Sequence, residues 1–160
     1  MTVELTRGAI YNTPSFGGNT APNGAFVSLV PALGKDSFVT MGGLTSDSSQ
    51  PVLVVGGAVN LPGAPAHFVL NNNQISVTWA PAPGVTIEDQ MDFLIAQISL
   101  TDDAEGLLRL FSSTDSGPPT IYHSPIYNGH IEFYPVPEPA SGVLLLAALF
   151  GIANRRVNGR

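Results

Sequence analysis

The chain of 160 residues contains no cysteine, and charged side chains make up only 11% of it. The absence of cysteine excludes disulfides and every metal site or nucleophile that depends on a thiolate. Charged residues usually account for about a quarter of a globular domain. Lys and Arg are especially scarce, with six against twelve Asp and Glu. Because binding to nucleic acid requires clustered basic residues, we expect no nucleic-acid partner.

The few charges are divided unevenly along the chain. Residues 1–135 contain only three basic residues, Arg7, Lys35 and Arg109, against eleven acids, which gives a net charge of −8. From residue 136 onward, three arginines face Glu138 alone, which gives +2. An acidic body does not adsorb to an anionic membrane, whereas a basic tail does.

What the sequence has in quantity is glycine (17 residues), proline (14 residues) and hydrophobic residues (44%). The hydrophobic content is too high for a disordered chain, and the frequent turn residues suit many short strands. We therefore expect residues 1–134 to form a mainly β, extracellular domain. The expected architecture is an antiparallel β-sandwich, jelly-roll-like, followed by a single C-terminal transmembrane helix.

Short apolar runs bounded by turn residues predict the individual strands. Within residues 74–79, Ile75, Val77 and Trp79 alternate with Ser76 and Thr78, which is the period of a half-buried strand. This places Trp79 in the core. The other predicted strands cover residues 25–30, 36–41, 52–55, 67–70 and 129–134.

The strongest local pattern joins two apolar segments, residues 91–100 and 107–111, through the polar residues 101–106. A glycine, Gly106, ends the polar segment, so the pattern predicts a β-hairpin. A helix from Ile87 to Leu100 is the alternative. The β-branched and aromatic residues of the segment favour the strand.

The end of the chain combines three features in a fixed order. Pro137, Glu138 and Pro139 come first, and the two prolines hold this stretch extended. An uncharged apolar run, residues 140–153, follows and is rich in Leu, Ala and Gly, as lipid-facing helices are. Arg155 and Arg156 then resist transfer across a bilayer. The side chains expected to anchor the helix are Val143, Leu144, Leu145, Leu146, Leu149, Phe150 and Ile152.

In this order the three features resemble the PEP-CTERM sorting signal of exported proteins in Gram-negative bacteria. The resemblance implies that residues 135–160 are a sorting and anchor segment, recognised and processed by the membrane enzyme exosortase. The product would be displayed at the cell surface or released into extracellular polysaccharide, in a structural or binding role. The segment 36–42 is also similar to one found in exported members of this group. The chain would then be a substrate rather than an enzyme, with no cofactor.

Two alternatives concern the ends of the chain. An apolar run of about 14 residues is short for a membrane span, so a helix packed on the domain's own core is the competing interpretation. Export requires a signal peptide, but residues 1–7 contain Glu4 and no apolar stretch. We expect the true start to lie upstream. A tail-anchored cytoplasmic protein is the alternative.

The spacing of the acidic residues and histidines matches no established metal-binding or catalytic motif. Asp102, Asp103 and Glu105 lack the spacing of a calcium loop, which favours a solvated turn. A secreted hydrolase would need a carboxylate pair, for which the candidates are Glu88, Asp89 and Asp92. The spacing of His67, His123 and His130 matches no metal motif.

Tyr122 and Tyr127 occupy a polar segment that contains proline, which predicts a loop. Tyrosine rings on a surface can stack on sugars. The two residues are therefore the candidates for ligand contact, and a carbohydrate-binding module is the alternative function.

Overall fold

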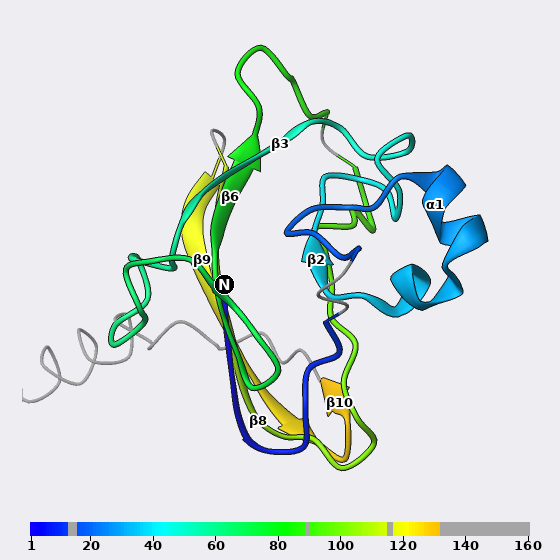
Figure 1. The fold of residues 1–160 in the computed structure, drawn as a ribbon. Coiled ribbons are helices and arrows are strands. Elements are labelled where there is room, and N and C mark those ends of the chain that lie inside the picture. The colour runs from blue at the N-terminus through cyan, green and yellow to red at the C-terminus, as the bar shows by residue number, and fades with distance from the viewer. Residues whose placement is uncertain (13–15, 89, 115–116, 132–160) are drawn as a thin grey trace, which may run out of the picture.

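The structure, a computed structural model, describes residues 1–12, 16–88, 90–114 and 117–131, and in these ranges the chain is mainly β with antiparallel sheets (Figure 1). The largest sheet has six strands in the order β10-β9-β8-β1-β5-β4. Its strands are β1 (Thr2–Arg7), β4 (Val69–Leu70), β5 (Gln74–Ser76), β8 (Glu105–Thr114), β9 (Gly117–Tyr127) and β10 (His130–Ile131).

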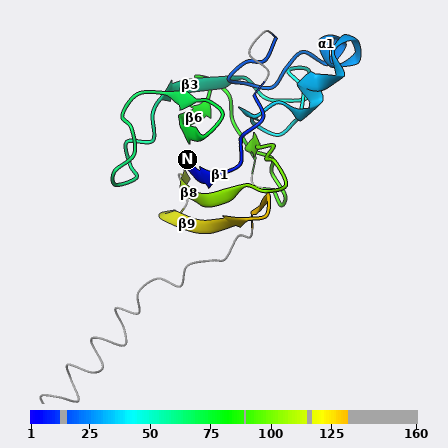
Figure 2. The same cartoon turned by 60° about the horizontal axis from the view of Figure 1, so that its bottom comes forward.

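Two further sheets have two strands each. They pair β2 (Phe38–Val39) with β7 (Ala96–Gln97), and β3 (Val52–Gly56) with β6 (Thr78–Pro81). Figure 2 shows β3 and β6 on one side of the N-terminus, and β8 and β9 on the other. The described helices are α1 (Gly24–Leu29) and the 3-10 helix η1 (Pro31–Lys35).

Strand β1 lies inside the six-stranded sheet, between β5 and β8. Val3 is fully buried and pairs with Ile75 on β5 and with Leu108 on β8. These three residues belong to the main hydrophobic core. The strand predictions above do not include residues 2–7, so the strand that joins the two halves of the sheet was missed.

The predicted hairpin of residues 91–100 and 107–111 is wrong. Strand β7 pairs with β2, and β8 forms its hairpin with the following strand, β9. The backbone N–H of Thr40 donates to Ile95 O at 2.9 Å, which ties residues 91–100 to a distant segment. The alternative helix from Ile87 to Leu100 is also wrong, because the described residues of this stretch contain no helix.

Residues 25–30 were predicted to be a strand, but residues 24–29 form helix α1. The side chain of Asn23 accepts a hydrogen bond from the Ala25 N–H at 2.9 Å, which caps the helix. Phe26 and Leu29 are 58% and 77% exposed. The apolar run therefore reflects exposed helix positions, not the buried face of a strand.

The other predicted strands are confirmed in position, although most are shorter than expected. Strands β2, β3, β4 and β10 lie within or overlap residues 36–41, 52–55, 67–70 and 129–134. Residues 132–134 are outside the described ranges.

The predicted strand 74–79 is extended but divides at Val77 into β5 and β6, which have different partners. Ile75 and Val77 are buried as expected, and Trp79 packs partly buried against the core. Ser76 is buried as well, contrary to simple alternation. Its hydroxyl donates to Pro65 O and accepts from the Ala58 N–H.

Gly106 sets how closely β1 and β8 approach. It lies on β8, opposite Leu5, and a Cβ at this position would overlap the backbone oxygen of Glu4. We predict that Gly106→Ala lowers the free energy of unfolding by about 2 kcal/mol or more, because backbone atoms must move. Urea unfolding measures this. Gly18→Ala is the control, because its Cβ would enter nearly open space. Equal stability of the two variants would contradict the close-approach explanation.

The α-amino group of Met1 makes stability depend on pH. It donates to Val77 O at 2.7 Å in the core, and burial lowers its pKa from 8.0 to about 6. Between these values the unfolded chain binds more protons than the folded chain. The free energy of unfolding should therefore rise from pH 6 to pH 8, by on the order of 2 kcal/mol.

Urea unfolding at several pH values tests this for the polypeptide that begins at Met1. The same polypeptide with an acetylated amino group is the control, because it cannot titrate there. A pH dependence that survives acetylation would contradict the assignment to this amino group.

Candidate functional sites

The residues of the predicted sorting segment lie outside the described residues. These are Pro137, Glu138 and Pro139, the anchor residues of 143–152, and Arg155 and Arg156. The last described strand, β10, ends at Ile131. In the part of the chain that the structure describes, no helix has the length and apolar character needed to cross a membrane. The sorting segment therefore stays a prediction from the sequence.

The two candidate tyrosines lie on strand β9, not on the loop that the prolines suggested. Residues 124 and 126 of this strand are buried, whereas residues 123, 125 and 127 are exposed. Tyr122 shares the inner face with the buried residues, and Tyr127 points the other way. The two rings therefore face opposite sides of the sheet and do not form one platform.

Tyr127 is the more accessible of the two, at 68% exposed. It lines a small surface hollow together with Pro125, Asn128 and His130. Asn128 and Gly129, with φ of 49° and 74°, make the tight turn that brings β10 back beside Tyr127. Of the two candidate tyrosines, Tyr127 therefore remains a candidate for sugar contact, because its exposed ring lies beside the side chains of Asn128 and His130.

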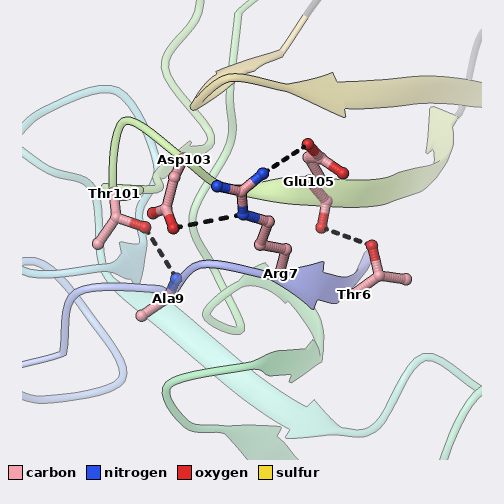
Figure 3. Close-up of polar contacts among 6 residues, drawn as sticks. All are labelled: Thr6, Arg7, Ala9, Thr101, Asp103 and Glu105. Carbon is pink, nitrogen blue, oxygen red and sulfur yellow. Dashed lines mark hydrogen bonds and ion pairs between the residues drawn. The ribbon is translucent and has the colours of Figure 1, made fainter.

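Arg7 pairs with two of the acidic residues at the start of β8 (Figure 3). Arg7 Nε lies 3.7 Å from Asp103 Oδ2, and Arg7 Nη1 lies 3.4 Å from Glu105 Oε1. Thr101 Oγ1 accepts the Ala9 N–H at 2.9 Å, which fixes the turn against the end of β1. Asp102 and Asp103 are exposed, so the turn is solvated as predicted, although it does not connect the predicted hairpin.

The other candidate acids and the histidines lie on the surface. Glu88 and Asp92 are exposed, and Asp89 is outside the described residues. His67, His123 and His130 are exposed as well. Within the described ranges, no group of three or more His, Asp or Glu side chains is arranged to hold a metal ion.

A groove that the sequence did not indicate opens between β6 and β8, just beyond Met1. It has a volume of about 210 Å³. Trp79 lines it, and the indole Nε1 is buried with no hydrogen-bond partner. Its lining residues have uncharged side chains and are Met1, Met41, Ala58, Asn60, Leu61, Thr78, Trp79, Ala80, Pro81, Ile95, Leu110, Phe111, Ser112 and Ser113. Only the pairing of strands far apart in sequence creates this groove.

No protein-family model matches the chain, and no curated protein or solved structure matches it either.

The position of Arg7 gives a prediction for calcium. Because its guanidinium already pairs with Asp103 and Glu105, millimolar Ca²⁺ should leave the unfolding temperature of the protein unchanged. Differential scanning calorimetry with Ca²⁺ and with Mg²⁺ tests this. Arg7→Gln removes the competing cation and is the comparison variant. A rise in unfolding temperature with Ca²⁺ in the unaltered protein would contradict the prediction.

Proposed function

We propose that this protein is an exported surface or matrix component whose C-terminal segment is a sorting signal of the PEP-CTERM type, processed by exosortase. The observation that carries the proposal is the order of three features at the end of the sequence. Pro137, Glu138 and Pro139 precede an apolar run, and Arg155 and Arg156 follow it. The chain is a substrate in this proposal, and the β body is the cargo.

Each feature has a physical role in such a signal. The prolines keep the recognition site extended and accessible, as a processing enzyme requires. Residues 140–153 span about 21 Å as a helix, somewhat less than the roughly 30 Å hydrocarbon core. Tilt-free insertion with local thinning and snorkelling arginines accommodates such a mismatch. The terminal arginines hold the end on the cytoplasmic side.

The body suits a structural or binding role outside the cell. We propose that its sheets pack as a sandwich of the jelly-roll type, with the β3–β6 pair opposite β8 and β9. Its net charge of −8 keeps it off an anionic membrane, so that the tail alone provides attachment.

Binding of extracellular polysaccharide is the second candidate function. The exposure of Tyr127 beside Asn128 and His130 favours it, and we restrict it to Tyr127. A secreted hydrolase acting through Glu88 and Asp92 has less support, since both are exposed.

Expression in a host with exosortase, compared with the same host lacking it, tests the sorting proposal. We expect intact mass spectrometry to show that the tail is lost only when the enzyme is present. Glu138→Ala, with Pro137 and Pro139 also changed to Ala, should abolish processing. Pro118→Ala with Pro119→Ala is the matched control on the body and should leave it unchanged.

The arginines are tested separately. Arg155→Gln with Arg156→Gln should reduce the fraction of molecules anchored in the membrane, measured by fractionation and immunoblotting. A mature protein that keeps its intact C-terminus in the host with exosortase would refute the processing proposal, whatever the arginine variants do.

A further inference from the structure

We propose that the outer face of the six-stranded sheet, at the Arg7 end of β1, binds a neutral oligosaccharide that crosses the strands and occupies hollows on both sides of the Tyr127 side chain. This assignment rests on polysaccharide binding, the second candidate function, and adds to it a second hollow and a class of sugar. The site lies at the end of β1 that is remote from Met1.

Tyr127 separates two hollows on this face. The first has a volume of about 240 Å³ and is lined by Tyr127 with Pro125, Asn128 and His130. The second, of about 430 Å³, is lined by the same tyrosine and by residues of β1, β8 and β9, which are Glu4, Thr6, Glu105, Gly106, Leu107 and Ile126. A ligand in either hollow therefore contacts the exposed side chain of Tyr127.

Strand pairing places the two hollows in one line across the sheet. His130 on β10 is opposite Tyr127 on β9. Glu4 on β1 is opposite Leu107 on β8, which is in turn opposite Pro125 on β9. Directly paired residues project from the same face. From β10 to β1 the line crosses three inter-strand spacings, about 14 Å in all. A ligand that reaches both hollows is therefore an extended oligomer rather than a single sugar.

The loop that covers Ser76 leaves this part of the face open. Its Pro62 O accepts a hydrogen bond from Arg109 at 2.8 Å. Two positions further toward the Arg7 end of β1, Leu107 is exposed, and so is Tyr127 on the next strand. A ligand can therefore reach these residues without displacing the described loop.

The charges on this face favour a neutral ligand. Among the described residues, both arginines are paired: Arg109 Nη2 lies 3.0 Å from Glu4 Oε1, and Arg7 Nη1 lies 3.4 Å from Glu105 Oε1 (Figure 3). An anionic sugar would meet the two carboxylates, which repel it. The side chains of Glu4 and Glu105 are 46% and 37% exposed, so their oxygens can accept hydrogen bonds from sugar hydroxyls.

The aromatic ring supplies the apolar contact. A pyranose has C–H groups on its faces and hydroxyls around its rim, and a tyrosine ring can stack on such a face. Leu107 and Pro125 extend the apolar surface. Asn128 and His130 provide further donors and acceptors beside it. Apolar and hydrogen-bonding groups in alternation suit a chain of hexoses, whereas an apolar partner would leave the buried polar groups without hydrogen bonds.

Two neutral glucose oligomers, cellohexaose and laminarihexaose, test the class of sugar. Hexagalacturonate, an anionic oligomer, is the comparison. We expect isothermal titration calorimetry of the full-length chain to show binding of at least one neutral oligomer and no binding of the anionic one. If neither neutral oligomer binds, the inference is wrong. Binding of hexagalacturonate in their place would retain polysaccharide binding as a function but overturn the neutral class.

Substitutions test the position of the sugar. Tyr127→Ala should weaken binding of the neutral oligomer about tenfold, whereas Tyr127→Phe keeps the ring and should bind as the unaltered protein does. Glu4→Gln with Glu105→Gln should weaken it about fivefold and should allow hexagalacturonate to bind, because the repelling carboxylates are gone. Glu88→Gln with Asp92→Asn is the matched control, since it removes two exposed acids outside both hollows and should change neither affinity.

Three outcomes would overturn the assignment. If Tyr127→Ala weakens binding but the Glu4 and Glu105 variant behaves like the control, the sugar occupies the first hollow alone, and only the second hollow is wrong. If neither variant changes the affinity, the sugar binds elsewhere on the protein. If the unaltered protein is a dimer in size-exclusion chromatography and Tyr127→Ala is a monomer, this face is an interface between two copies instead.

Discussion

The close pairing of β1 with β5 and β8 is the constraint on which the described fold depends. It brings residues 2–4, 74–76 and 105–109 together, although roughly a hundred residues separate the first from the last. Val3 is fully buried at the centre of this junction. Because Gly106 has no side chain, β8 can approach the backbone of Glu4 and Leu5. Without this junction the β8–β9 hairpin would have no sheet to join.

The peripheral interactions follow from the same pairing. The side chain of Arg109, on β8, reaches across β1 to Glu4 at 3.0 Å and donates to Pro62 O at 2.8 Å. It thereby holds the loop that covers Ser76. Arg7, at the other end of β1, pairs with Asp103 and Glu105 across the start of β8. The exposed pairs of Arg7 contribute little stability, but both arginines contact the loops that border β1.

The sequence predicts the class of the fold better than its connections. Composition and turn residues indicate a mainly β chain, and clear alternation locates the strand around Ile75 and Val77. The hairpin was assigned to the wrong strands because residues 91–100 are as apolar as a central strand. Strand β9 was interpreted as a loop because it contains Pro118, Pro119 and Pro125. Local patterns cannot show that residues 91–100 pair with β2, because that partner lies far along the chain.

Candidate sites were predictable to a lesser degree. The solvated acidic turn follows from composition, but the pairing of Arg7 with Glu105 joins residues almost a hundred positions apart. Tyr122 and Tyr127 were grouped because both are aromatic and close in sequence. Once β9 is a strand, their separation of five positions places them on opposite faces. The groove between β6 and β8 has no local signal, since its lining residues come from segments far apart in the sequence.

Strand β9 contains Pro118, Pro119 and Pro125, which cannot donate to a ladder. On the side away from β8, its described partner is the short strand β10, which pairs with Ile126 and Tyr127. Prolines on an edge strand protect it from pairing with other chains. The prolines that suggest a loop in the sequence are therefore residues that suit β9 to a position near the edge of the sheet.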